Sequence, residues 1–236
     1  MAVADDRVAF AGKIIAIDGP AGSGKSTTAR LLAERLGLTY LDTGAMYRAV
    51  ALFALRRGVS FDDAPALAEI AAKVKIEFRN DPQQGQLIFL NNEDVTDAIR
   101  TPEATRGSSA VAVYPGVRRE MVRRQQELGR KGGLVAEGRD TTSVVFVEAD
   151  LKIYLDADLD TRAERRYLEA AQRGQKTSVD EQKRLLIARD KNDSERADSP
   201  LVCAPGAIVV DTTGLTIEGQ VDKIIELARD AFAKKR

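Results

Sequence analysis

The stretch KIIAIDGPAGSGKSTTARLLAERLG, residues Lys13–Gly37, sets the framework for the rest of the chain. An apolar run typical of a buried strand leads into a glycine-rich turn, which is followed by a lysine, hydroxyl residues and strong helix formers. The turn Gly19–Ser26 fits the pattern G-x-x-x-x-G-K-[ST] between a strand and a helix, which is the context that the pattern requires. Glycines let backbone N–H groups face a phosphate, and a helix N-terminus adds partial positive charge. The stretch therefore predicts a nucleoside triphosphate site, with ATP as the expected ligand.

Outward from this loop, short apolar runs alternate with longer helical patterns. Helices are expected after the first two strands and at the C-terminal end, and the strands are expected at residues 13–18, 38–44, 133–140, 151–158 and 206–214. Buried strands that alternate with helices are typical of a parallel sheet covered on both faces. We therefore expect an α/β fold of the P-loop class, with three αβα layers and a five-stranded parallel sheet.

Two segments depart from this alternation. Residues 74–95 contain short apolar runs in hairpin spacing, which predicts a small antiparallel β insert. Residues 166–186 are polar and charged with Gly174 near the middle, which predicts a helical excursion that moves.

Composition excludes several classes of function. The 236 residues include 36 Lys and Arg against 36 Asp and Glu, so no overall field attracts a nucleic-acid backbone. No apolar run approaches the ~20 residues that span a bilayer, and the acidic N-terminal stretch does not resemble a signal peptide. A single cysteine, Cys203, cannot form an internal disulfide, so we expect a cytoplasmic protein and a small buried residue at this position. Because the chain has no histidine, a histidine base and the common histidine metal sites are excluded.

A nucleotide loop occurs in kinases, in GTPase switches and in mechanical ATPases. GTPases usually carry N-K-x-D for guanine, and this tetrapeptide is absent from the sequence. Mechanical ATPases usually have an apolar strand that ends in Asp-Glu, whereas here Asp156 is followed by Ala157. Asp156 or Asp158 is better explained as the cap of a helix that follows. A small-molecule kinase is therefore favoured.

A kinase needs a second anion site, and arginines stand where one is expected. Arg48 follows the second predicted strand, and Arg139 with Asp140 follows the third, at the strand ends where open α/β sheets bind ligands. Arginine clamps phosphate bidentately. Further along, Arg189, Asp193 and Arg196 are spaced i, i+4, i+7, which predicts one helical face. That face fits either a binding site or an exposed network of salt bridges.

Over almost the whole chain the sequence resembles the bacterial cytidylate kinases, which phosphorylate CMP and dCMP with ATP. The stretches that carry the resemblance are IDGPAGSGKST, LDTGAMYRAVA, EDVTDAIRTPE, SSAVAVYPGVRREMVRRQ, LVAEGRD, KIYLDADLDTRAERR and ARDKNDSERADSPL. The resemblance implies one nucleoside monophosphate kinase domain over residues 1–236, with a core of 13–59, 105–165 and 187–236. It also implies that residues 60–104 form a nucleotide-binding insert and residues 166–186 a short lid.

The resemblance also assigns roles to single residues. It implies an ATP site that consists of Gly19, Pro20, Ala21, Gly22, Ser23, Gly24, Lys25, Ser26, Thr27, Arg165 and Arg166. It implies a CMP site that consists of Thr43, Arg48, Ser109, Arg118, Arg139, Asp140, Arg189, Asp193 and Arg196. The expected catalytic residues are Lys25, Arg139, Asp140 and Arg162, and Ser26 is the expected ligand of Mg²⁺. The implied partners are ATP and CMP or dCMP, with no nucleic acid and no membrane, and the expected state is a monomer.

One stretch departs from the family pattern, and other functions stay open. After Gly-Arg-Asp the family usually reads x-G-T-V-V-F-P, whereas this chain has Thr142 for the glycine and Val147 for the proline, beside Arg139 and Asp140. An alternative is another P-loop kinase, of the dephospho-coenzyme A or shikimate type, in which Asp42 would activate an alcohol. A nucleotide-dependent binding protein without an acceptor is the alternative from a different class.

Overall fold

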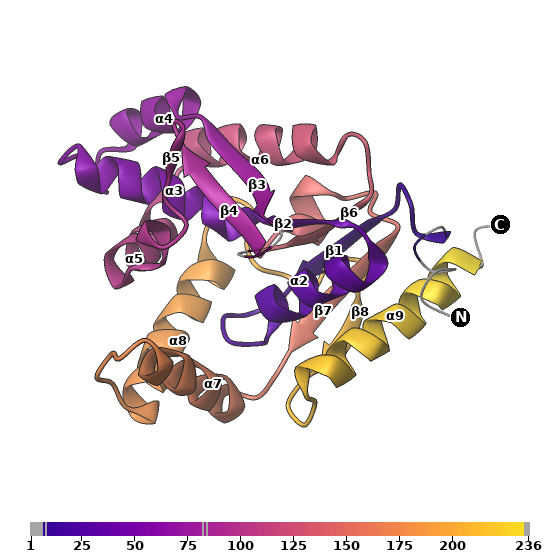
Figure 1. Ribbon diagram of the computed structural model, residues 1–236. Helices are drawn as coiled ribbons and strands as arrows, with labels where there is room; N and C mark the ends of the chain where they lie inside the picture. The colour runs from indigo at the N-terminus through magenta and orange to yellow at the C-terminus, as the bar shows by residue number, and fades with distance from the viewer. Residues whose placement is uncertain (1–6, 8, 82, 84, 234–236) are drawn as a thin grey trace. The chain divides into compact units, whose positions relative to one another are not determined.

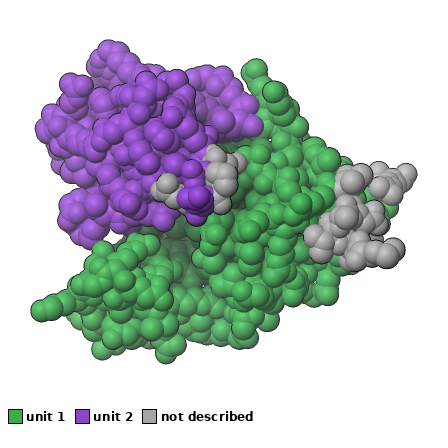
Figure 2. All heavy atoms as spheres, viewed as in Figure 1, with its two compact units in different colours: residues 1–41, 129–236 green, residues 42–128 purple. Residues whose placement is uncertain are grey.

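The computed structural model describes residues 7, 9–81, 83 and 85–233. Residues 1–6, on which the expectation about a leader rests, lie outside the described residues, as do residues 234–236 at the end of the expected last helix. The chain divides into two compact units, residues 1–41 with 129–236 and residues 42–128, which Figure 2 colours separately. The predicted insert, 60–104, lies wholly within the second unit, and the predicted lid, 166–186, within the first.

The first unit is built on a parallel sheet, which confirms the expected fold class (Figure 1). Within the described part of the chain the sheet has five strands in the order β2-β6-β1-β7-β8. The strands are β1 (Ile14–Asp18), β2 (Thr39–Asp42), β6 (Leu134–Glu137), β7 (Leu151–Asp156) and β8 (Ile208–Asp211). Strand β1 pairs in parallel with β6 and β7, and β7 pairs in parallel with β8. The carboxyl ends of β1, β6, β7 and β8 therefore share one edge.

Helices α2 (Lys25–Leu36) and α9 (Ile217–Ala233) pack with this sheet in one apolar core. Buried residues recur every three or four positions along α9, at Val221, Ile224, Ala228 and Phe232, which is the pattern of a helix that covers a core with one face. Strand residues such as Ile15 and Ile153 are fully buried in the same cluster. This packing holds α2 in place, and the phosphate loop leads directly into the first turn of α2.

The remaining helices of the first unit are α7 (Leu159–Gln172) and α8 (Val179–Glu195), with a π-helical turn, η2, at Thr141–Val145. Asp158 caps α7, because its side chain accepts a hydrogen bond from Thr161 N at 2.7 Å, and this confirms the predicted cap. The expectation for Cys203 was wrong. This residue lies in the irregular segment between α8 and β8 and is exposed.

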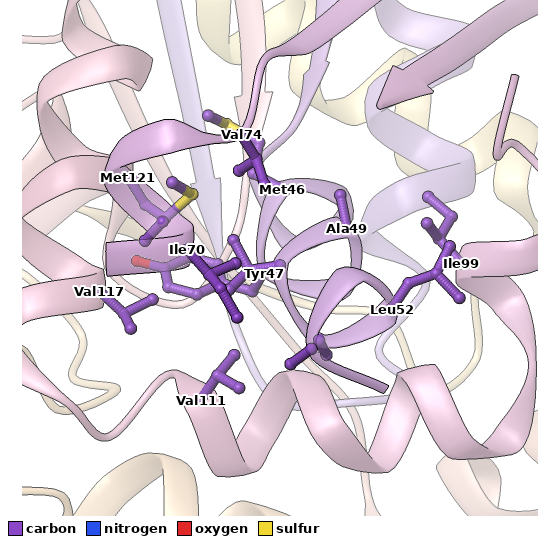
Figure 3. Packing of buried hydrophobic residues seen from close by; sticks show 14 of the residues in the cluster. Met46, Tyr47, Ala49, Leu52, Ile70, Val74, Ile99, Val111, Val117 and Met121 are labelled. Atoms are coloured by element: carbon purple, nitrogen blue, oxygen red, sulfur yellow. The ribbon is translucent and has the colours of Figure 1, made fainter. Parts of the chain in front are cut away.

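The second unit has its own core and a small antiparallel sheet. In the described residues its elements are α3 (Thr43–Arg56), α4 (Ala64–Lys73), β3 (Ile76–Asp81), β4 (Gly85–Leu90), β5 (Glu93–Asp94), η1 (Ala98–Arg100), α5 (Pro102–Val111) and α6 (Pro115–Gly129), whose last residue belongs to the first unit. The sheet order is β3-β4-β5, with antiparallel pairing, as the hairpin spacing predicts. Figure 3 shows residues from α3 packed with residues from α4, α5 and α6, among them Met46, Ile70, Val111 and Met121. No helix among the described residues has the length and apolar character that crossing a bilayer requires.

Candidate active site

The glycine-rich loop lies between β1 and α2, as its sequence pattern predicts. Gly19 has a φ of +147°, and a Cβ at this position would lie 2.0 Å from the carbonyl oxygen of Leu155 in β7. Gly24 caps α2 in the left-handed conformation, with a φ of +92°. Position 19 therefore requires glycine because a Cβ would clash and because φ is positive. Position 24 requires glycine chiefly because φ is positive. The loop leads directly into the N-terminus of α2, which favours an anion.

Lys25 is buried and folded onto its own loop. Its Nζ donates to the carbonyl oxygen of Pro20 at 2.6 Å and to Ser23 Oγ at 3.3 Å. The pKa of Lys25 is lowered well below its usual value, first because burial disfavours the charged form and then because Arg139 lies close enough to repel it. A bound phosphate would supply the negative charge that favours the protonated amine.

Ser26, the expected metal ligand, faces a carboxylate that the sequence reasoning missed. Ser26 Oγ donates to Glu137 Oε1 at 2.8 Å, and the hydroxyl of Tyr40 lies 3.5 Å from the same oxygen. Glu137 is the last residue of β6 and is 4% exposed. The signal that could have identified Glu137 is its position at a strand end, just before Gly-Arg-Asp. In the described part of the chain no group of three or more Asp, Glu or Cys side chains forms a metal site by itself.

Two buried polar residues from the C-terminal part of the chain contact the loop and the first turn of the helix that follows it. Gln220 in α9 accepts a hydrogen bond from Thr28 Oγ1 at 2.6 Å. Thr212, just after β8, donates from Oγ1 to the carbonyl oxygen of Ser23 at 3.0 Å. The sequence reasoning did not identify either residue, because each is far along the chain from the loop and carries no motif.

The arginines that were expected at the ATP phosphates lie on α7. Arg162 is buried and donates from Nη1 to the carbonyl oxygen of Ala21 in the loop, at 3.1 Å, and to Asp190 Oδ2, at 2.6 Å. Arg165 Nη1 donates to Thr212 Oγ1 at 3.1 Å. Arg166 forms an ion pair with Glu169 on its own helix. Arg162 therefore contacts the phosphate loop directly, Arg165 contacts Thr212, and Arg166 pairs with a residue of its own helix.

A second cluster gathers five of the expected CMP ligands within the first unit. Arg139 Nε donates to Asp193 Oδ2 at 2.8 Å, and Arg189 Nε lies 3.9 Å from the same oxygen. Arg196 Nη2 lies 3.8 Å from Asp140 Oδ1. The side chains of Asp193 and Arg196 are 7% and 5% exposed, so the cluster is not the exposed salt-bridged face that was the alternative interpretation.

The expected helical face at i, i+4, i+7 was wrong for its third member. Helix α8 ends at Glu195, and Arg196 is extended, with φ −62° and ψ 140°. Its Nε donates to the carbonyl oxygen of Ser199 at 2.7 Å, three residues further along the chain. Arg196 thus reaches Asp140 from just beyond the helix.

Opposite charges in the cluster stabilise one another in their ionised forms. Burial by itself would raise the pKa of Asp193, but the positive charges of Arg139 and Arg189 and the hydrogen bond from Arg139 outweigh it, so this pKa lies below its usual value. For Arg139, burial would lower the pKa, yet the charge of Asp193 and the hydrogen bond to it hold the pKa above its usual value. Both groups are therefore ionised at neutral pH.

The other expected CMP ligands belong to the second unit. Thr43 is the first residue of α3, and Asp42 caps that helix by accepting from Ala45 N at 2.9 Å. Arg48 Nη2 donates to the second oxygen of Asp42 at 2.7 Å. Asp42 is therefore occupied by a cap and an ion pair.

Arg118 and Ser109 lie on α6 and α5 of the same unit. Arg118 is buried, donates from Nη1 to the carbonyl oxygen of Ala112 at 3.3 Å, and has its guanidinium carbon 5.7 Å from the centroid of the Tyr47 ring. An arginine over an aromatic face is held by the ring quadrupole. Ser109 is partly buried.

Comparison with known proteins places this geometry in a family. The profile of the family described as cytidylate kinase matches residues 15–230. A cytidylate kinase of Bacillus cereus is 48% identical over 223 residues, which cover 93% of this chain and 97% of that protein. A bifunctional pantoate ligase/cytidylate kinase of a Synechococcus strain is also 48% identical over 223 residues, and the chain spans 41% of its length. An uncharacterized protein of Eubacterium ventriosum, whose crystal structure is known, has a TM-score of 0.51 at 14% identity and covers 93% of this chain and 99% of its own, which supports the fold alone. Because the profile matches most of the sequence and full-length relatives share nearly half of its residues, the chain belongs to the cytidylate kinase family.

Proposed function

We propose that this protein transfers the γ-phosphoryl group of ATP to CMP and dCMP. An oxygen of the acceptor phosphate bonds to the γ-phosphorus while the bond between that phosphorus and the bridging β,γ-oxygen breaks, and ADP leaves. The observation that carries the proposal is the buried cluster around Asp193, because Arg139 and Arg189 lie near enough to Lys25 to lower its pKa. A second set of anion-binding side chains next to a triphosphate loop is what a nucleotide acceptor requires. The names of the full-length relatives agree with it.

A phosphate group as acceptor explains how a chain without histidine can catalyse this transfer. The second pKa of a phosphate monoester is about 6, so the attacking oxygen is ionised near neutral pH and no general base has to remove a proton. Catalysis is then alignment of two anions and neutralisation of their charge. We assign this task to Lys25, Arg139 and Arg162, with Asp140 holding Arg196.

The residues around Ser26 fit Mg²⁺, which prefers oxygen ligands. The hydroxyl of Ser26 and the carboxylate of Glu137 lie 2.8 Å apart, and Glu137 brings the negative charge that a cation site needs. We propose that the Ser26 hydroxyl would bind the ion and that the Glu137 carboxylate would position Ser26 and supply negative charge beside the ion. When bound, the ion neutralises phosphate charge.

The alternative kinases require an activated alcohol, and the candidate base for that step was Asp42. Both of its oxygens are used, one by the Ala45 amide and the other by Arg48. This disfavours a base at this position and supports a phosphate acceptor. That the protein is a cytoplasmic monomer stays a prediction.

Base recognition gives the sharpest test. Cytosine offers acceptors at O2 and N3, which match the donor-only guanidinium of arginine, whereas uracil carries a hydrogen on N3. A site that leaves buried donors without acceptors rejects the wrong base strongly. We therefore expect a strong preference for CMP over UMP, and Arg196→Met should narrow the gap in kcat/KM and raise the KM for CMP.

The measurement is a screen of nucleoside monophosphates, shikimate and dephospho-coenzyme A as acceptors, with ATP and Mg²⁺, followed by kcat/KM for CMP and UMP in the variant. Lys191→Met removes an exposed cation from α8, the helix that ends just before Arg196, and serves as the matched control. An unchanged CMP-to-UMP ratio in Arg196→Met would contradict the pocket. Transfer to shikimate or dephospho-coenzyme A in the screen, but not to CMP, would contradict the function.

A further inference from the structure

Asp18 is a buried carboxylate for which the reaction as described above has no use. It is the last residue of β1, it is fully buried, and it directly precedes Gly19 of the phosphate loop. Its two oxygens accept hydrogen bonds from two consecutive threonines. Oδ1 accepts from Thr141 N at 2.9 Å and from Thr141 Oγ1 at 2.7 Å, and Oδ2 accepts from Thr142 N at 2.7 Å and from Thr142 Oγ1 at 2.6 Å.

We call this arrangement of Asp18, Thr141 and Thr142 the Asp18 clamp. A buried ionised carboxylate is tolerated only when donors compensate it, and charge-assisted bonds of this length are strong. Each oxygen is bound in the same way, by one amide and one hydroxyl of the same residue. The geometry therefore fixes both the position and the orientation of the segment that donates.

The donating segment follows directly after two of the proposed CMP ligands. Thr141 and Thr142 begin the π-helical turn η2, and Arg139 and Asp140 immediately precede it. The turn is anchored to Asp140 as well, because the carbonyl oxygen of Asp140 accepts from the amides of Val144 and Val145 at 2.9 and 3.1 Å. The clamp thus ties the backbone at Asp140 to the end of the strand that leads into the phosphate loop.

We propose that the Asp18 clamp is a positioning device that holds Arg139 and Asp140 in register with the phosphate loop, and that the Thr142 hydroxyl is a working part of it. The proposal rests on the function proposed above for Arg139 and Asp140. A glycine at position 142, as in the usual family pattern, would supply the amide donor but no hydroxyl. The threonine that replaces the usual glycine at position 142 therefore adds a hydrogen bond to Asp18. Thr142 acts through Asp140 and Arg139 without touching substrate.

The test compares three substitutions in one turn. Thr142→Val removes the hydroxyl and keeps the branched shape, and Thr142→Ser keeps the hydroxyl. Ser143→Ala removes a neighbouring hydroxyl that has no hydrogen-bond partner among the described residues, so it controls for any loss of polarity in the turn. For each variant, kcat and the KM values for CMP and ATP are measured, together with the melting temperature and the exchange of the backbone amides of residues 139–142.

Misplacing a binding group by about 1 Å can cost up to ~10²-fold in rate, so the loss of one of the clamp's hydrogen bonds is expected to cost about tenfold. Thr142→Val should lower kcat/KM for CMP by that factor, leave the KM for ATP within about twofold, and speed amide exchange at residues 139–142. Thr142→Ser and Ser143→Ala should behave like the unmodified protein. Kinetics of Thr142→Val that match those of Ser143→Ala, even with a lowered melting temperature, would overturn the proposal, because the hydroxyl would then serve stability alone.

Two further variants distinguish a failure of the clamp proposal from a loss of folding and from a failure of the proposed function. If Thr142→Val does not fold, Thr142→Ala removes the same hydroxyl with less volume and is compared with Ser143→Ala in the same way. Arg139→Met tests the proposed function itself. An unchanged KM for CMP in Arg139→Met, with impaired Thr142→Val, would remove Arg139 from the CMP site and leave the clamp in place as a device that acts through Asp140.

Discussion

At the scale of the residue, Lys25 is held by its own loop. It donates to the carbonyl oxygen of Pro20 and to Ser23 Oγ, and burial lowers its pKa. Lys25→Ala should therefore leave the fold intact and reduce kcat by ~10²–10³-fold, the usual cost of one charge-stabilising donor. Arg30→Ala, which removes an exposed cation from the same helix, is the control. Turnover of Lys25→Ala near that of the control would show that the loop does not hold the reacting phosphates.

The position of Glu137 beside Ser26 leads to a separate prediction about the binding of Mg²⁺. In Glu137→Gln the Ser26 hydroxyl keeps an acceptor, but the negative charge is lost, so a cation is held less tightly. The Mg²⁺ concentration that gives half-maximal rate should rise several-fold, whereas the affinity for ATP without metal should not fall. Titration calorimetry with ATP, in the presence and absence of Mg²⁺, measures this directly. Equal loss of affinity under both conditions would assign Glu137 to the loop and not to the ion.

The site residues divide into those that the sequence could and could not reveal. The placement of Lys25 and Ser26 at the start of the helix after the loop was predictable, because the whole loop is encoded in one short segment with a physical reason for each position. Glu137, Asp18 and Gln220 were missed because their roles depend on partners 111 to 192 positions away in the chain. A carboxylate at a strand end has many uses, and only the fold selects one.

At the scale of the element, apolar runs predicted the five strands, and the signal is strongest for β1 and β6, which are buried along almost their whole length. The end of α8 was less predictable. The spacing of Arg189, Asp193 and Arg196 suits a continuing helix, but the chain leaves the helix after Glu195 and the Arg196 side chain bonds to Ser199. Helix ends depend on such tertiary contacts as much as on propensity.

Helix α9 holds the first turn of α2, directly after the phosphate loop, through a buried polar contact. Gln220 is fully buried, it accepts from Thr28, and a Cβ on Gly24 would lie 2.8 Å from its Oε1. Gln220→Ala leaves the Thr28 hydroxyl without this acceptor and opens a small cavity, so the free energy of unfolding should fall by about 2 kcal/mol. The KM for ATP should rise as well, because the contact lies at the N-terminus of α2. Urea denaturation and steady-state kinetics check both effects, with the exposed Asp230→Ala as control, and a variant as stable as this control would contradict the role of Gln220.

At the scale of the whole molecule, the charges sum to zero and the chain has no histidine. Carboxylates, lysines and arginines with ordinary pKa values do not titrate between about pH 6 and pH 8. Lys25 is different, because burial lowers its pKa in the folded protein, so the unfolded chain binds the extra proton and stability should rise with pH from the folded pKa of Lys25 up to its unfolded value of about 10.4. The acid limit is set by carboxylates whose pKa is lower in the folded protein than in the unfolded chain.

Asp193, in the second cluster, is a buried carboxylate of this kind. The direction in which it changes stability with pH follows from its pKa. Its pKa in the folded protein lies below the value of about 3.9 expected in the unfolded chain, so the unfolded chain takes up the proton first as the pH falls. The stability that Asp193 contributes is complete above that value and is lost as the pH drops through the folded pKa. Asp193→Asn should lower the free energy of unfolding at pH 7, because Arg139 and Arg189 lose their counter-charge in a buried place. As the pH falls below about 3.9 the difference should shrink, and it should vanish below the folded pKa of Asp193, where a protonated aspartate and an asparagine are alike in charge. Urea denaturation of both proteins from pH 7 downwards measures the gap, and a gap that stays constant with pH would mean that the ion pair of Asp193 with Arg139 adds nothing to stability.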